Sequence, residues 1–328
     1  MGAYVLRRVL WLPFVLLIVS FATFALCRFG PGDPLSVAAG QVRDQSVLAQ
    51  VRADRGLDLP IEQQYVRWLS KAVRGDFGES YIQRGFSISE LLFPRMWISA
   101  QLSILALFIV VAVGIPLGLL AARLAGTWLD PMIIGSLLFL QAIPSLVLIP
   151  PLVWLFALQL NWLPVGGWGG GIFSIWWIAG VIAVPIPDPH VYLPLVAFTL
   201  PGFLGVARLV RYTALEVNTE DYIRTARAKG LSEATVQFRH VLPNSLLPLI
   251  TVVGFALAGT IEGALFVETI LGINGIGRFL FQAVTSRDYD VILASTVIFT
   301  TVFVLTNLAA EIVYGWVDPR IRVSASRS

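Results

Sequence analysis

Residues 98–122 have the sequence ISAQLSILALFIVVAVGIPLGLLAA, which contains no Asp, Glu, Lys, Arg or His. An α-helix needs about 20 predominantly apolar residues to cross the hydrocarbon core of a bilayer, because each residue adds about 1.5 Å. This stretch is long enough and carries no ionisable side chain. It therefore predicts a transmembrane helix, and it sets the expectation for the rest of the chain.

Other stretches of the chain are apolar over a similar length. Together with the first they give six predicted spans: Val9–Cys27, Ile98–Ala122, Met132–Leu158, Tyr192–Val210, Ser245–Phe266 and Val291–Tyr314. A further apolar run, Ile172–Val184, is shorter and is bounded by glycines and prolines, so we expect an interfacial or re-entrant element there. The predicted fold class is an all-α integral membrane protein with six transmembrane helices.

The composition also indicates a bilayer environment. Hydrophobic residues make up 57% of the chain and charged residues 13%, about half of the charged share of a typical soluble domain. The net charge of +3 is too small to indicate a nucleic-acid partner. The single cysteine, Cys27, excludes an intrachain disulfide and a thiolate metal cluster, and we expect no metal site.

The basic residues indicate the orientation, because Lys and Arg are enriched in the short cytoplasmic loops of membrane proteins. With six spans and a cytoplasmic N-terminus, the short outer loops hold only Arg278 and Arg287. The predicted cytoplasmic pieces hold Arg7, Arg8, Arg123, Arg211, Arg224, Arg227, Lys229, Arg239, Arg320, Arg322 and Arg327. A seventh span at 172–184 would move the basic cluster at 224–239 outside, which favours six spans with both termini in the cytoplasm.

The spans divide the chain into parts. These are an N-terminal transmembrane helix (1–28), an extracytoplasmic subdomain (29–97), a transmembrane core (98–316) with a cytoplasmic loop (211–244), and a cytoplasmic tail (317–328). The first helix lacks a small-x-small cleavage site, which favours a retained helix over a signal peptide. In the subdomain, Pro60 predicts the start of a helix that ends near Gly75. The subdomain either packs on the spans or forms a docking surface for a solute-delivering partner.

The cytoplasmic loop begins with NTEDYIRTARAKG, whose first residue is Asn218. Asn218 or Thr219 is suited to cap a short helix, and Gly230 fits the left-handed position just past its end. A second short helix is expected from Ser232, and Pro243 is expected to stop it. The loop is therefore predicted to hold two short helices.

One face of the first of these helices carries Ile223, Ala226 and Gly230, which are small or modest in size. Such a face can lie close to another surface while Arg224 and Arg227 point elsewhere, and this suits a groove on a partner protein. A solvated connector that returns the chain to the membrane explains the same pattern. Periodicity alone leaves both alternatives open.

The loop resembles the EAA loop of ATP-binding-cassette (ABC) importer permeases, which has Glu-Ala-Ala, three residues, Gly, nine residues and Ile-x-Leu-Pro. Alignment on Gly230 places Arg224-Thr225-Ala226 at the Glu-Ala-Ala positions and His240-Val241-Leu242-Pro243 at the end. The first two positions and the isoleucine position, where His240 stands, depart from the pattern. The variant YIRTARAKGL that is found here is similar to that of the dipeptide and oligopeptide branch, in its first-permease (B-type) subunit.

Other short stretches resemble the same branch in order and spacing. They are Pro31-Gly32-Asp33-Pro34, Gly56-Leu57-Asp58-Leu59-Pro60, Arg74-Gly75-Asp76-Phe77-Gly78, Gly114-Ile115-Pro116-Leu117-Gly118, Arg287-Asp288-Tyr289 and Asp318-Pro319-Arg320-Ile321-Arg322. None is specific by itself, because glycine and proline mark turns in many proteins. Their combined order extends the resemblance over nearly the whole chain.

The resemblance implies an alternating-access permease in a prokaryotic cytoplasmic (inner) membrane, embedded in lipid. The implied partners are a second homologous permease, two ABC ATPase subunits and an extracytoplasmic substrate-binding protein. The loop helix of such permeases sits in a cleft of the ATPase. By position, Thr225, Ala226, Gly230 and Leu231 form the seat, with Arg224 and Arg227 at its rim. The solute is expected to be a di- or oligopeptide, with glutathione and nickel complexes as alternatives.

ATP hydrolysis is expected on the partners, which bind ATP and Mg²⁺, and this chain is not expected to be an enzyme. A Walker-type loop needs a Lys followed by Ser or Thr, whereas Lys71 precedes Ala72 and Lys229 precedes Gly230. A secondary transporter would predict inverted repeats with matching broken helices, which we do not find. A channel or a membrane enzyme is a further alternative that no motif supports.

Three side chains are candidates for the substrate path. Glu262 lies inside the fifth span, where an ionisable group costs about 2.5 to 3.5 kcal/mol and requires a reason. It either faces the path and binds a substrate amine, or forms a structural hydrogen bond to a neighbouring span. Glu268 lies near the outer end of the same span. Gln141, with Pro144 close by, makes the third span irregular.

Overall fold

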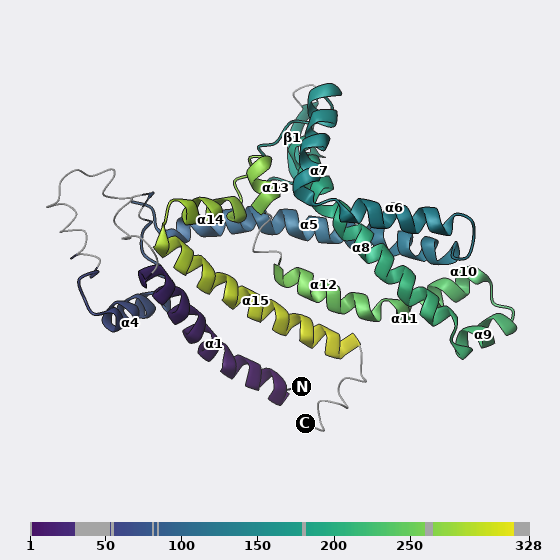
Figure 1. Cartoon of the computed structure of the whole chain (residues 1–328), viewed down its shortest axis with the longest axis horizontal. Helices are drawn as coiled ribbons and strands as arrows, with labels where there is room; N and C mark the ends of the chain where they lie inside the picture. Colours follow the sequence, from purple (N-terminus) through teal and green to yellow (C-terminus); the bar gives the residue numbers. More distant parts are fainter. Residues whose placement is uncertain are drawn as a thin grey trace.

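Figure 1 shows the computed structural model as an elongated bundle of helices. The structure describes residues 2–29, 53, 56–80, 82–83, 85–178, 182–259 and 265–317. Helices α4 (Ile61–Ala72) and α14 (Ile276–Thr285) lie at one end of the bundle, which we term the α14 end. Helices α9 (Asp221–Ala228) and α10 (Glu233–Val236) lie at the other, the α9 end (Figure 1).

Within the described residues, four helices are long and apolar enough to cross a membrane, and a bent pair would make a fifth. The four are α1 (Gly2–Phe29), α5 (Ile88–Arg123), α8 (Tyr192–Asn218) and α15 (Tyr289–Val317). They coincide with four of the six predicted spans, so the all-α membrane fold class is confirmed.

Helix α5 begins ten residues earlier than the predicted span at Ile98. Ser87 and Glu90 form a capping box, in which the Ser87 N–H donates to Glu90 Oε2 at 3.2 Å. This cap starts the helix at Ile88, and apolar periodicity alone could not reveal it. The last part of the predicted 29–97 subdomain is therefore the first part of a spanning helix.

The predicted third span is broken. Helix α6 (Asp130–Ala142) and the helix that starts at α7 (Ser145–Leu152) meet at an angle of 98°. Pro144 caps α7, and a π-helix (Val153–Gln159) follows the prolines inside α7. Since proline has no N–H to donate, these positions cannot complete a regular helix. The predicted irregularity of this span is confirmed.

The fifth predicted span is only partly described. Helix α12 (Leu247–Gly259) occupies most of it, and α13 (Leu265–Ile270) begins after a gap. Residues 260–264, which include the path candidate Glu262, lie outside the described residues.

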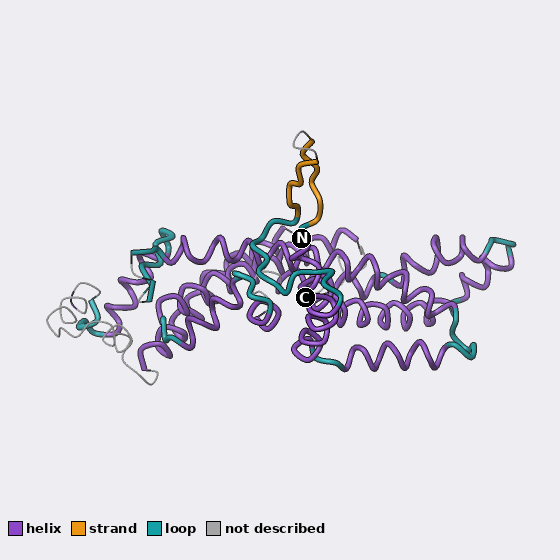
Figure 2. The backbone as a smooth tube through the Cα atoms, turned by 90° about the horizontal axis from the view of Figure 1, so that it is seen from above, coloured by secondary structure: helices purple, strands orange, loops and turns teal. Residues whose placement is uncertain are grey.

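The apolar run at 172–184 takes part in a β-hairpin. Strands β1 (Phe173–Ile178) and β2 (Ile182–Pro187) pair antiparallel, with Phe173 opposite Pro187. The hairpin projects away from the helices (Figure 2). β-branched and aromatic residues favour strands, which accounts for a hairpin in an otherwise helical chain. Whether it is interfacial or re-entrant stays a prediction.

Close packing of α5 on α8 forms the centre of the bundle. A Cβ placed on Gly114 would lie 2.7 Å from Val206 Cβ, and one on Gly118 would lie 2.5 Å from the Ala207 carbonyl oxygen. Small residues at such positions let two helix backbones approach each other. The glycines of the Gly114–Gly118 motif are therefore needed for helix packing.

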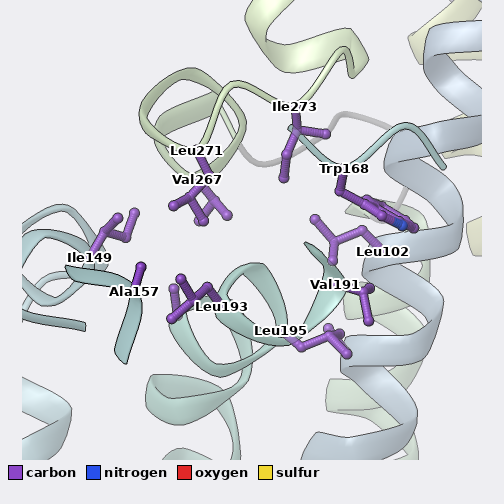
Figure 3. Close-up of a cluster of buried hydrophobic side chains, with 12 residues drawn as sticks. Leu102, Ile149, Ala157, Trp168, Val191, Leu193, Leu195, Val267, Leu271 and Ile273 are labelled. Carbon is purple, nitrogen blue, oxygen red and sulfur yellow. The ribbon is translucent and has the colours of Figure 1, made fainter. Parts of the chain in front are cut away.

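A second buried cluster joins the two segments on either side of the hairpin to α5 and α13. Figure 3 shows Leu102 of α5 beside Trp168, Val191 and Ile273. Trp168 is buried, and its indole N–H donates to the Gly171 carbonyl at 2.8 Å. The Gly167 N–H donates to the Leu271 carbonyl at 2.8 Å. These contacts hold the base of the hairpin against the bundle.

Helix α4, which begins after Pro60 as predicted, packs on α1. The Tyr65 hydroxyl lies 2.9 Å from Ser20 Oγ, and its ring contacts Phe21 and Phe24 with centroids 5.3 and 5.4 Å apart. Gly75 follows the helix with φ of +82°. The predicted helix and its packing role are confirmed, while a docking role for this segment stays a prediction.

Candidate functional site

The site with the most defined geometry is the segment from Thr219 to Ser245, which we term the α9–α10 loop. It connects α8 to α12 and forms the α9 end of the bundle (Figure 1). Helix α10 continues into a π-helix (Gln237–Val241) and then α11 (Leu242–Ser245). The prediction that two short helical pieces flank Gly230 is confirmed.

The start of α9 differs from the prediction. Its N-cap residue is Glu220, and neither Asn218 nor Thr219 caps it. The Thr219 hydroxyl donates back to the Glu216 carbonyl at 2.7 Å, so it completes the end of α8. Asn218 is the last residue of α8, and its side-chain oxygen accepts a bond from Arg227. Both predicted caps are wrong. The Thr219 side chain bonds within α8, and the Asn218 side chain bonds to the guanidinium of Arg227 and not to the first N–H groups of α9.

Helix α9 ends as the glycine predicts. Gly230 has φ of +76°, and its N–H donates to the Arg227 carbonyl at 2.9 Å. The Leu231 N–H donates to the Ala226 carbonyl at 3.4 Å. This pair of bonds forms a Schellman motif, in which the residue after the cap adopts a left-handed conformation. No heavy atom lies within 4 Å of a Cβ built on Gly230, so the backbone conformation alone requires glycine.

Pro243 does not stop the second helix, contrary to the prediction. It lies at the start of α11, directly after the π-helix. Proline has no N–H to bond to the carbonyl four residues earlier, and the wider π-turn accommodates the missing bond. The Thr213 hydroxyl of α8 donates to the Ser245 carbonyl at 3.0 Å, which ties this end of the loop to α8.

The apolar face of α9 is buried inside the chain. Ile223 is fully buried and Ala226 is 6% exposed. They pack in a cluster with Ala122 of α5, Ala214 of α8 and Val236 of α10. The face that the sequence suggested for a partner is therefore used to seat α9 on its own bundle. In this arrangement the Ala226 side chain is not exposed to a partner.

A charged cluster braces the loop on another side. Arg227 donates to Glu233 through Nε at 3.2 Å and Nη2 at 2.9 Å, and to Asn218 Oδ1 at 2.9 Å. Gln237 donates to Glu233 Oε1 at 3.1 Å and to Asn218 Oδ1 at 3.4 Å. We term these four residues the loop clamp. They join the end of α8, α9 and the α10 helix.

The clamp changes the proton affinity of its carboxylate. The hydrogen bonds from Arg227 and then Gln237 lower the pKa of Glu233 from 4.5 to about 2, although partial burial opposes them. The bond to Glu233 also raises the pKa of Arg227. Both groups stay charged near neutral pH. Glu233 and Gln237 were not among the predicted functional residues, although opposite charges flanking a helix-ending glycine are a signal for a pair such as Arg227 and Glu233.

The outward face of α9 and its turn remain exposed. Arg224 has 71% of its side chain exposed and contacts only Asp221 among the ion pairs of the described residues, at 3.4 Å. Thr225 is exposed, and Leu231 and Tyr222 are 40% and 44% exposed. Of the six residues expected to couple to a partner, only Ala226 is buried. Arg224, Thr225, Arg227, Gly230 and Leu231 are exposed, and Arg227 also takes part in the clamp.

Glu268 of α13 lies next to the start of α14 and is fully buried. Ser99 of α5 donates to its Oε1 at 2.6 Å, and the Arg278 N–H donates to its Oε2 at 3.0 Å. The Ile276 N–H donates to Ser99 Oγ at 2.9 Å. Glu268 and Ser99 thus satisfy N–H groups in the first turn of α14. Here the carboxyl group is structural, and a role in the substrate path stays a prediction.

Gln141, the other path candidate that is described, is half-buried just before the break between α6 and α7. A Cβ placed on Gly205 of α8 would lie 3.3 Å from its Nε2, so the amide packs against α8. The three path candidates do not form one site in the described residues: Gln141 and Glu268 contact different helices, and Glu262 is not described.

Comparison with known structures identifies the fold. The chain is similar to a chain of the MetNI methionine ABC transporter, solved in inward-facing conformations, with a TM-score of 0.51 and 15% identity over 70% of this chain and 97% of that one. The chain therefore shares the fold of that chain.

Sequence comparison gives the family. Residues 114–323 match the binding-protein-dependent transport system inner membrane component, and residues 1–84 match the N-terminal part of such membrane components. The chain belongs to this family, and it is a permease subunit of an ABC importer. It is 35% identical to a probable peptide ABC transporter permease, y4tP, of Sinorhizobium fredii, covering 98% of this chain and 100% of that one. It is 34% identical to the oligopeptide permease OppB of Salmonella typhimurium, covering 97% and 99%.

Proposed function

We propose that this permease imports di- or oligopeptides across the inner membrane of a prokaryote, with both termini and the α9–α10 loop in the cytoplasm. The peptide assignment is supported by the two relatives, one a probable peptide permease and the other an oligopeptide permease. The orientation is supported by the basic residues of the loop, since cytoplasmic loops are enriched in Lys and Arg.

The proposed complex contains a second homologous permease, two ABC ATPase subunits and an extracytoplasmic binding protein. ATP and Mg²⁺ bind to the ATPases, where hydrolysis takes place. The observation that supports coupling most directly is the seating of α9. Its apolar face is fixed on α5 and α8, while Arg224, Thr225 and Leu231 face outward. A cleft of an ATPase subunit can hold such a face.

The mechanism follows from this seating. Ile223 packs against Ala214 of α8 and Ala122 of α5, so a displacement of α9 pushes on the two helices that form the centre of the bundle. Close-packed interiors transmit such displacements, because they have low compressibility. Movement of α5 and α8 opens the permease pair alternately to each side, after the binding protein delivers the solute.

Reconstitution tests the transport function. The complete complex in proteoliposomes, with a labelled oligopeptide and the binding protein outside, is expected to accumulate peptide only when ATP is available to the ATPases. Accumulation without hydrolysis, or hydrolysis without any peptide transport, would contradict the proposal.

Labelling tests the orientation separately. Ala228 is exposed on α9, and a Cys27→Ala, Ala228→Cys chain has one accessible thiol. A membrane-impermeant maleimide is expected to react with it in inverted vesicles that lack the ATPases and not in intact cells. Labelling of intact cells would place the loop outside and end the coupling proposal.

A further inference from the structure

The loop clamp lies on a side of α9 that does not face the buried cluster of Ile223 and Ala226. The chain leaves α8 at Asn218, and Arg227 returns to the same residue nine positions later at 2.9 Å. Helix α9 therefore folds back on the end of α8. The buried cluster holds α9 through Ile223 and Ala226, and the clamp holds its last turn through Arg227.

We propose that Arg227 is a positioning residue: held by Glu233 and Asn218, it fixes the angle between α9 and α8 so that α9, α10 and the end of α8 move as one unit. This inference rests on the proposed function, because it explains how the loop keeps its shape while an ATPase displaces it. It also assigns to Arg227, whose side chain is 40% exposed, a role in bracing the loop in place of a role at the rim of the partner contact.

The geometry distinguishes Arg227 from Arg224. Two guanidinium nitrogens of Arg227 bond to the two carboxylate oxygens of Glu233, which is the bidentate geometry that a planar guanidinium favours. Arg224 instead reaches only Asp221, three residues earlier and 98% exposed, at 3.4 Å. Exposed pairs of this kind contribute little. Arg224 is thus the arginine placed to meet a partner.

The shape of the guanidinium is required as well as its charge. Arg227 bonds to α10 and to α8 at the same time through a rigid fork, whereas a lysine ammonium is a point charge on a flexible stem. Arg227→Lys is therefore expected to lose the joint contact with Asn218 and Glu233 while it keeps the charge.

A double-mutant cycle in the reconstituted complex tests the inference. The quantity measured is the coupling ratio, the number of peptide molecules imported per ATP hydrolysed. Arg227→Gln and Glu233→Gln are each expected to lower it by about threefold or more, and the double variant no further, because residues in one network are not additive. The exchange Arg227→Glu with Glu233→Arg is expected to restore part of the ratio. Additive losses, or a loss with Arg227→Gln alone, would overturn the inference and assign Arg227 to the partner contact.

A second measurement needs no partner and separates this inference from the proposed function. Spin labels at Ala228→Cys and Tyr212→Cys, in a Cys27→Ala background, report the distance between α9 and α8 in the solubilised full chain; both positions are exposed. Arg227→Gln is expected to broaden the distance distribution, and Lys229→Gln, which removes a neighbouring cation, is expected to leave it narrow. An unchanged distribution in Arg227→Gln would overturn the inference even if transport remains coupled to ATP. If peptide transport did not depend on ATP but Arg227→Gln still broadened the distance distribution, only the proposed function would be contradicted.

Discussion

The two ends of the bundle are held together by contacts of different range. At the α9 end, Arg227 bonds to residues six and nine positions away in the sequence. At the α14 end, Ser99 and Glu268 are 169 residues apart, and the buried pair Ser80 and Asp288 are 208 apart. The α9 end is thus braced within its own loop and packed on α5 and α8 through Ile223, whereas polar contacts at the α14 end join the first third of the chain to its last third. We therefore expect the α9 end to move relative to the α14 end, and we term them the movable end and the fixed end.

The same turn motif occurs at both ends and sharpens the comparison. Helix α14 ends with Arg287 at φ of +55°, and the Asp288 N–H donates to the Ala283 carbonyl at 2.8 Å. Helix α9 ends with the equivalent bonds around Gly230. The movable end uses the residue that adopts this conformation without strain, and the fixed end holds an arginine in it.

The largest effect on stability is expected at the fixed end. Glu268→Ala removes a buried carboxyl group and leaves the Ser99 hydroxyl and the Arg278 N–H without their acceptor. The expected loss is about 2 to 4 kcal/mol in the free energy of unfolding. Thermal unfolding of the solubilised chain measures it, with the exposed neighbour change Thr269→Ala as the control. Equal stability of the two variants would show that the buried contacts do not stabilise the fixed end.

The next prediction concerns peptide uptake and a substitution in the Gly230 turn, at the movable end. Gly230→Val forces a β-branched residue into a left-handed backbone, at a cost of about 1 to 2 kcal/mol. We expect the variant to lose most peptide uptake while the chain still assembles, because only the loop is distorted. Gly230→Asn is the matched control, since Asn tolerates this conformation. Wild-type uptake by Gly230→Val at normal expression would remove the turn from the coupling mechanism.

These two ends also show how far the sequence could predict the structure. Four spans, the broken third span, the α4 helix and the Gly230 turn follow from composition and local spacing, which are visible in one sequence. The cap on α14 does not, because Ser99 and Glu268 meet only after the chain has folded across 169 positions. Thr219 was misassigned because its hydroxyl bonds back to Glu216 within α8, and Pro243 because the preceding π-turn accommodates a proline. The coupling residues stay predictions, although burial removes Ala226 from the exposed set.

A smaller change in stability is expected from a substitution in the turn at Arg287, which ends α14. Arg287→Gly relieves the left-handed strain but increases the freedom of the unfolded chain, so we expect a gain of at most about 1 kcal/mol in stability. Ser286→Gly is the control, because Ser286 has φ of −90° and gains nothing from glycine. Thermal unfolding of both variants compares them. A clear loss with Arg287→Gly would show that the arginine side chain, and not the backbone, is required there.

Titration of Glu233 is not expected to change the coupling ratio over the neutral pH range. The pKa of Glu233 in the folded loop is about 2, below its ordinary value of 4.5, so its stabilising contribution is complete above 4.5 and is lost as the pH falls toward 2. The coupling ratio of the wild-type complex is therefore expected to be constant from about pH 5 to about pH 8 with respect to this group. A fall in this range that Glu233→Gln abolishes would contradict the charged clamp.

Site-specific photo-cross-linking tests the central claim most directly: a partner ATPase contacts the outward face of the α9–α10 loop, and the α14 end is not its contact. A photoreactive residue at the exposed Thr225 is expected to cross-link to an ATPase subunit in the intact complex, and one at Phe281, 49% exposed on α14, is expected not to. Cross-linking of the ATPase from Phe281 and not from Thr225 would contradict the account.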